Sequence, residues 1–432
     1  MDILTQLKKQ SEQVEVVSLQ NEKTTVEYEA NQLKTCTVTE TKGTAVRVIR
    51  KGRLGFAASS DENAMEKLAV NALESATYGD QASFSFPDPQ AAPAVRTFDP
   101  VIADLSIPRL VEMGREILDL VLPVEPEARC NISLERSLAS VSIRNQTGLD
   151  VSFQTSPLAL GFEIDRIEGD DILMLFDQIG TTLWDKDYLE FARRLVEKLK
   201  KARSLTSVKP GRMPVLFAPS GTLALGLPLS MGLNGKEVLK GTSPMKGRIG
   251  EKLFHEKITL LDDGTMDGRF ASASYDDEGV PHRCNVLVEK GVLKGFVYDL
   301  KTAAQSGVSS TGNAVRSLFN PPAPALTNFV IQPGETALKD ILAGIDEGIL
   351  VEDLLGLGQG NIISGAFSNP LALAFKVEKG EIVGRVKDLS IAGNIYELLK
   401  NVGAVSKEAQ WVYSTVYAPY ILIPEMNVAG KA

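Results

Sequence analysis

Histidine is scarce in this chain: only His255 and His282 occur among 432 residues. A helical zinc-hydrolase motif needs two histidines about one turn apart on one face, with a glutamate between them as the base. Glu256 follows His255, but no second histidine stands at the required spacing. We therefore expect His255 to be a surface residue of a strand over residues 254–261 and not a metal ligand.

Cysteine, long apolar runs and excess positive charge are also scarce. Three cysteines, Cys36, Cys130 and Cys284, make no disulfide framework in so long a chain and favour a reducing compartment. The apolar run at 223–233 is shorter than the roughly 18 residues of a membrane span. A net charge of -9 disfavours nucleic acid, which needs a clustered positive surface. Because the first residues also lack the apolar core of a signal peptide, we expect a cytoplasmic protein without a membrane span.

The pattern that is present is α+β and rich in strands. Runs of β-branched residues between glycine and asparagine breaks predict strands at 14–19, 24–28, 33–39 and 45–49, with a hairpin turn at Lys51–Gly52. Apolar periodicity predicts helices that follow Asp61 and Ser106 as N-caps, and others at 187–202 and 336–347.

Two breaks in this pattern divide the chain. A proline-rich stretch ends near residue 100, and a second break lies at 207–211. We expect three domains: an N-terminal α+β domain (1–98), a middle α+β domain (99–208) and a large β-rich C-terminal domain (209–432). The fold class is therefore α+β, with antiparallel sheet and helices first and a β-rich domain last.

Two polar groups are candidates for chemistry. His282 and Cys284 are two residues apart, so on a strand they would share a face, as a Cys–His nucleophile pair does. A partly exposed strand pair is the plainer interpretation, because no orienting partner is visible. Asp276, Asp277 and Glu278 are adjacent, whereas calcium loops space their ligands. A solvated turn or contacts to a peptide backbone fit them better.

Two further stretches are ambiguous. The glycine-rich run 356–360 superficially suggests a nucleotide loop, but no helix that could receive phosphate is expected after it. The run 309–313 with Arg316 is polar and either caps a helix or contacts substrate. Composition does not separate these two roles, so Asn313 and Arg316 are kept as contact candidates.

Several long, ordered phrases in the third segment resemble the TldD/PmbA family, also called modulator-of-gyrase proteins. The phrases are 276–281 (DDEGVP), 310–316 (STGNAVR), 327–328 (TN), 333–334 (PG), 391–394 (IAGN) and 428–430 (VAG). The first two segments fit the family layout with weaker motifs. The resemblance implies a two-subunit metalloprotease, in which a TldD-like member binds zinc through a helical His-Glu-x-x-x-His motif and a later cysteine. The other member, PmbA or TldE, lacks these ligands.

The resemblance also locates the metal positions in this chain. The helix that follows the strand 214–217 would place them near Leu227, Pro228 and Gly232, where Pro228 is expected to disturb the helix, and the cysteine position falls at Val405. None of these residues can hold zinc or accept a proton from water. The resemblance thus implies the PmbA/TldE side of the family, with no cofactor.

The leading hypothesis is a non-catalytic subunit that forms a heterodimer with a TldD-like metallopeptidase and encloses extended peptide. Sheet edges suit such peptides because they pair with any backbone. The alternatives are a homodimeric peptide-binding or scaffold protein, and an autonomous hydrolase that uses the 276–278 carboxylates or the His282/Cys284 pair. The older family name suggests control of DNA gyrase, which this acidic chain would exert only indirectly.

Overall fold

The computed structural model describes residues 2–430 and contains two large sheets. The first has seven strands in the order β3-β2-β1-β4-β6-β7, with β5 paired to β4. Its strands are β1 (Gln13–Glu29), β2 (Gln32–Arg50), β3 (Arg53–Ser59), β4 (Arg129–Asn145), β5 (Asp150–Thr155), β6 (Leu158–Glu168) and β7 (Asp171–Thr181). The α+β, β-rich fold class is confirmed.

This sheet runs through the predicted boundary at residue 98. Strand β1 pairs antiparallel with β4 from Glu15–Asn145 to Tyr28–Ile132 without a register shift. The two predicted N-terminal domains therefore share one sheet, and a division of the chain into three domains stays a prediction. The four short strands expected before residue 50 are two long ones, because β1 and β2 continue through polar residues exposed to solvent.

Helices cover one face of this sheet. They are α1 (Ile3–Leu7), the 3₁₀ turn η1 (Glu62–Ala64), α2 (Met65–Ser75), α3 (Pro100–Ala103), α4 (Ile107–Val121) and α5 (Glu190–Lys201). Side chains alternate between the two faces of a strand, so Val14 and Val16 pack under α1 and α2, while Val26 and Tyr28 pack under α4. The predicted N-caps are confirmed, since Asp61 and Ser106 each accept a hydrogen bond from a backbone N–H of the turn that follows.

The C-terminal part forms an eleven-stranded sheet around its own core. The strands are β8 (Gly211–Phe217), β9 (Leu260–Asp263), β10 (Cys284–Glu289), β11 (Val292–Leu293), β14 (Phe329–Ile331), β15 (Glu347–Leu354), β16 (Ala366–Glu378), β17 (Glu381–Val386), β18 (Leu389–Asn394), β19 (Ala404–Val412) and β20 (Val416–Gly430). A separate pair joins β12 (Ala314–Val315) to β13 (Ala323–Pro324). The helices are α6 (Leu223–Gly232), α7 (Gly235–Lys240), α8 (Leu300–Ser306), α9 (Leu338–Ala343), η2 (Ile362–Ser364) and α10 (Ile395–Leu398).

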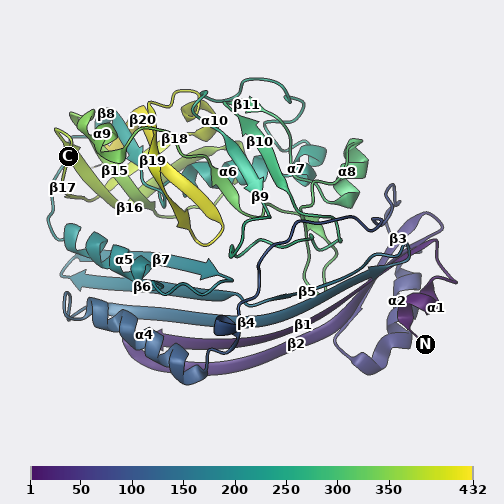
Figure 1. Cartoon of the computed structure of the whole chain (residues 1–432). Helices are drawn as coiled ribbons and strands as arrows, with labels where there is room; N and C mark the ends of the chain where they lie inside the picture. Colours follow the sequence, from purple (N-terminus) through teal and green to yellow (C-terminus); the bar gives the residue numbers. More distant parts are fainter. Residues whose placement is uncertain (1, 431–432) are drawn as a thin grey trace.

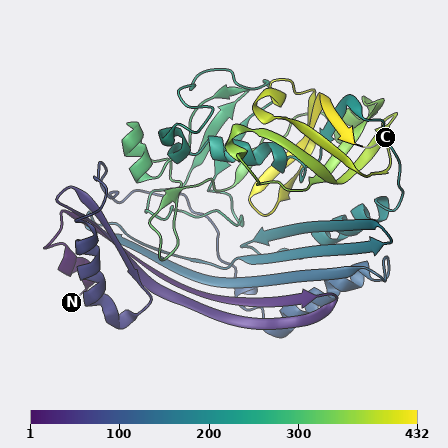
Figure 2. The ribbon, with the colours of Figure 1, turned by 180° about the vertical axis from the view of Figure 1, so that it is seen from behind.

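The C-terminal part, residues 211–430, lies along the face of the first sheet that the helices leave uncovered, and the chain ends lie at opposite ends of the molecule (Figures 1 and 2). An apolar cluster is shared by the two parts around the β7 edge, where α5 meets β15 and β16. Within residues 2–430 there is no helix with the length and apolar character needed to cross a membrane.

Two predicted elements are shorter in the structure. The strand expected over 254–261 is wrong for most of its length, because β9 begins only at Leu260 and turns precede it. The helix expected at 336–347 covers only α9, and Glu347 already begins β15. The Lys51–Gly52 turn is confirmed: φ is 51° and 68° at these residues, as a hairpin turn with two left-handed residues requires.

Candidate functional site

The acidic loop 276–278 lies between β9 and β10 and points inward. Asp276 is buried and accepts hydrogen bonds from the backbone N–H groups of Glu278 (2.9 Å), Val280 (2.9 Å) and Ala314 (3.0 Å). Burial, followed by the neighbouring Glu278 carboxylate, holds the pKa of Asp276 well above its ordinary value. Asp276 therefore ties the loop to the start of β12 and is not the solvated turn residue expected from sequence.

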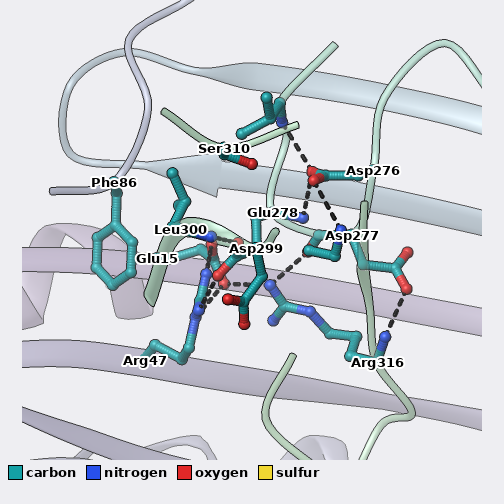
Figure 3. A network of polar contacts seen from close by, with 12 residues as sticks. Glu15, Arg47, Phe86, Asp276, Asp277, Glu278, Asp299, Leu300, Ser310 and Arg316 are labelled. Carbon is teal, nitrogen blue, oxygen red and sulfur yellow. Dashed lines mark hydrogen bonds and ion pairs between the residues drawn. The ribbon is translucent and has the colours of Figure 1, made fainter. Parts of the chain in front are cut away.

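Glu278 belongs to a buried group of four charges, which we call the charge quartet: Glu15 on β1, Arg47 on β2, Glu278 and Arg316 (Figure 3). Their side chains are 1%, 2%, 0% and 5% exposed. Arg47 donates to Glu278 (2.5 Å) through Nη1, and to Glu15 through Nε (2.9 Å) and Nη2 (2.5 Å). Arg316 Nη2 donates to Glu15 (2.7 Å). Two carboxylates and two guanidinium groups thus alternate.

The pKa values of the two quartet carboxylates move in opposite directions. Burial would raise the pKa of Glu15, but the charges and hydrogen bonds of Arg316 and Arg47 more than offset it, so the pKa is lowered. Burial raises the pKa of Glu278. Arg47, the only member of the quartet that bonds to Glu278, lowers this pKa but does not offset the effect of burial. Glu278 also accepts from the backbone N–H of Leu300 (2.8 Å). The Phe86 ring lies 4.9 Å from the Arg47 guanidinium carbon, at the edge of the group.

The other two contact candidates are also engaged within the chain. Asp277, whose pKa is raised by burial, accepts a hydrogen bond from the backbone N–H of Arg316 (2.7 Å). Asn313 is buried and donates to Asp262 (2.6 Å) and to the carbonyl of Ala325 (3.0 Å). Asp277 is half-buried, whereas Asn313 is buried against Asp262 and Ala325 of the C-terminal part itself. Their contact with a peptide stays a prediction.

The positions that the resemblance assigns to metal ligands carry no donor atoms. Leu227, Pro228 and Gly232 lie on α6, which continues through Pro228 although a disturbed helix was expected. Val405 is buried on β19, where it pairs with Ile421. Among residues 2–430, no three or more His, Cys, Asp or Glu side chains are arranged to hold a metal ion.

The space beside this helix is also filled. A Cβ atom at Gly232 would lie 2.6 Å from Tyr396 Oη and 2.8 Å from Met245 Cε. The Tyr396 hydroxyl is held within hydrogen-bond distance of the carbonyl oxygens of Pro228 (3.2 Å) and Ile363 (3.1 Å). A larger ligating side chain at residue 232 would therefore have to displace a tethered ring. These residues do not fit a zinc ion.

A cavity that sequence reasoning missed opens over α6. It has a volume of about 580 Å³ and is lined by Leu227, Pro228, the glycine-rich loop and the start of β16. The loop residues Gly356, Gly358 and Gly360 have φ values of 73°, 92° and 78°. No local signal in the sequence connects the loop to α6, because more than 120 residues separate them. The loop shapes this cavity and precedes only the short turn η2.

The remaining candidates do not form a nucleophile pair. His282 is buried before β10 begins, and burial lowers its pKa to about 4, so it is neutral at pH 7. Cys284 is exposed and faces Asp263 across the β9–β10 pair. Burial and the Asp263 carboxylate raise the pKa of the Cys284 thiol, which opposes the reactive thiolate. His255 is half-buried and accepts a hydrogen bond from the backbone N–H of Lys257 (3.2 Å).

Comparison with known proteins gives consistent matches. Residues 210–430 match the family described as PmbA/TldA metallopeptidase C-terminal domain, and residues 14–76 match domain 1 of the same family. The crystal structure of TldE from Thermococcus kodakarensis superimposes with a TM-score of 0.89 at 28% identity, and the alignment covers 99% of both chains.

Two relatives from Haemophilus influenzae carry different family names. A metalloprotease TldD homologue is 33% identical over 256 residues, which are 56% of this chain and 53% of that protein. A metalloprotease PmbA homologue is 26% identical over 290 residues, which are 66% of this chain and 60% of that protein. The chain thus spans little more than half the length of these two relatives.

Proposed function

Because the chain belongs to the PmbA/TldD family of metallopeptidase-like proteins, we propose that it is the non-catalytic, PmbA/TldE-like subunit of a two-subunit zinc protease. The observation that carries this proposal is the chemistry of α6 and β19. Leu227, Pro228, Gly232 and Val405 offer no nitrogen, carboxylate or thiolate to a metal. The Tyr396 ring also fills the space beside Gly232.

The partner in this proposal is a homologue that carries the His-Glu-x-x-x-His motif. Relatives named as TldD and PmbA homologues occur together in Haemophilus influenzae, as a two-subunit protease requires. This chain would contribute walls to a shared chamber for extended, unfolded peptide, because strand edges recognise backbone regardless of side chains. We place the complex in the cytoplasm, from the composition of the chain.

The test is reconstitution from separately purified subunits. The chain, and a homologue with the intact motif from the same genome, are assayed for hydrolysis of an unfolded peptide alone and as a 1:1 mixture, and the mixture is passed over a sizing column. We expect a single heteromeric peak that hydrolyses the peptide, and no hydrolysis by this chain alone.

Two results would overturn the proposal. Hydrolysis by this chain alone, with one zinc ion per chain, would make it an autonomous peptidase. A stable homodimer that ignores the homologue at every ratio tested would instead favour the peptide-binding or scaffold alternative. In the control, the motif glutamate of the homologue is replaced by glutamine, which removes the general base. A complex with this variant should still bind the peptide but not cleave it.

A further inference from the structure

The contact between the first sheet and the C-terminal domain has two unlike ends. At the β7 edge, one apolar cluster runs from α4 and α5 through the sheet into β15 and β16, where it includes Leu350 and Phe375. Buried Arg385 on β17 also pairs with Asp171 at the start of β7. Burial of continuous apolar surface resists separation in any direction, so this end is firmly joined.

The other end, near β1 and β2, is held by the charge quartet, by a more exposed pair between Lys301 and Asp80, and by the buried side chain of Leu318, which lies against Gly43 of β2. The quartet crosses the contact twice, since Arg47 of the sheet pairs with Glu278 of the C-terminal domain and Glu15 pairs with Arg316. The apolar cluster beside it contains only three buried residues, Val17, Ile143 and Leu149. Desolvation of buried ions offsets most of their mutual attraction. The quartet therefore specifies the closed position but holds this end more weakly than the continuous apolar surface holds the β7 end.

A groove of about 750 Å³ lies on the same face of the sheet as the quartet. Glu15 and Glu27 are twelve residues apart on β1, so both point to this face, and Glu27 lines the groove. Strands β1, β4, β6 and β7 form its floor, and Phe270 of the C-terminal domain reaches into it. Of the residues that line the groove, only Phe270 belongs to the C-terminal part, so the groove is already open to solvent. Glu278, in contrast, is covered by the contact between the two parts.

We propose that the chain is a jaw: the apolar contact at the β7 edge is its hinge, and the charge quartet is a latch that holds the other end closed. Release of the latch exposes the quartet carboxylates and the loop 276–278 while the hinge stays packed. The jaw is a property of the single chain, so a test of its opening gives the same answer whether or not the proposed subunit role is correct.

The native cysteines allow a direct test. Cys36 on β2 and Cys284 on β10 are exposed and lie on opposite jaws, whereas Cys130 is buried and burial raises its pKa to about 12. Spin labels should therefore attach at Cys36 and Cys284 and leave Cys130 unmodified. Double electron–electron resonance then measures the distance between the jaws in the full chain.

The latch variants remove one crossing pair at a time. Arg47→Met combined with Glu278→Gln removes the first pair without leaving a lone buried charge, and Arg316→Met removes the contact to Glu15. The control is Arg212→Met, because the pair between Arg212 and Glu425 is exposed. Circular dichroism shows whether each variant keeps its fold; if Arg316→Met unfolds, the charge-balanced double variant still decides.

We expect one narrow distance distribution for the unchanged protein and for Arg212→Met. The latch variants should gain a second population at longer distance, with unchanged hydrogen-exchange protection in α5 and β15 at the hinge. A folded double variant with the original narrow distribution would overturn the proposal. Loss of protection at the hinge together with the latch would also overturn it, because the parts would then separate as wholes.

Discussion

Replacing Arg47 by methionine is expected to lower the free energy of unfolding by roughly 3–5 kcal/mol, the range for removing one partner of a buried ion pair. The magnitude follows from the contacts that are lost. Arg47 donates three hydrogen bonds to two carboxylates that are at most 1% exposed. After the change, Glu15 keeps Arg316, but Glu278 keeps only the backbone N–H of Leu300.

A second substitution isolates the cause. Adding Glu278→Gln to Arg47→Met removes the unpaired charge, so the double variant should be more stable than the single one by roughly 1–3 kcal/mol. The exposed control Arg212→Met should cost less than about 1 kcal/mol. Unfolding in urea at pH 7, followed by circular dichroism and tryptophan fluorescence, gives these differences. A cost of less than about 1 kcal/mol for Arg47→Met, or a further loss of stability when Glu278→Gln is added, would show that no unpaired buried charge is left at Glu278.

Three further outcomes are expected. Burial raises the pKa of Asp262 to about 6, so the folded protein binds this proton more tightly than the unfolded chain does. As pH falls from 7 towards 4, the free energy of unfolding should therefore rise by up to roughly 3 kcal/mol at this site. Urea unfolding of Asp262→Asn should not show this rise. Burial lowers the pKa of His282 to about 4, so the protein should lose stability at this site as pH falls from 6.5 to 4. The NMR titration of His282 should have its midpoint near pH 4. A midpoint near 6.5 would contradict the burial of this side chain. Gly232→Ala should lower the free energy of unfolding in urea by about 1–3 kcal/mol, because its Cβ would meet the Tyr396 hydroxyl oxygen. The loss should be smaller in a Tyr396→Phe background, which lacks that oxygen. Equal losses in both backgrounds would show that the steric strain lies elsewhere.

Local features were predictable from the sequence because their causes are local. The Asp61 and Ser106 caps bond to backbone one turn away, and the Lys51–Gly52 turn depends on two adjacent residues. The continuity of β1 could not be predicted from the sequence, because the exposed polar residues in its middle have the composition of a turn. Only the pairing of β1 with β4 shows that the strand continues through them.

The burial of the candidate site is the feature that the sequence alone predicted least well. Asp276, Asp277 and Glu278 have the composition of a solvated turn, but Asp276 and Glu278 are buried, and Glu278 pairs with the distant Arg47. Arg47 is 231 residues from Glu278 along the chain, and Arg316 is 301 residues from Glu15. No periodicity or spacing reports such pairings. The family phrases pointed to the loop 276–278, but the pairing of Glu278 with Arg47 of the first sheet required the structure.

The most direct test of the subunit assignment is the zinc content of the purified chain. The chain and a homologue with the intact His-Glu-x-x-x-His motif are dialysed together against the same trace zinc and measured by mass spectrometry under native conditions. We expect about one zinc ion on the homologue, as for a three-ligand site, and a substoichiometric amount on this chain. One tightly held ion per chain, retained by the C-terminal domain, would contradict it.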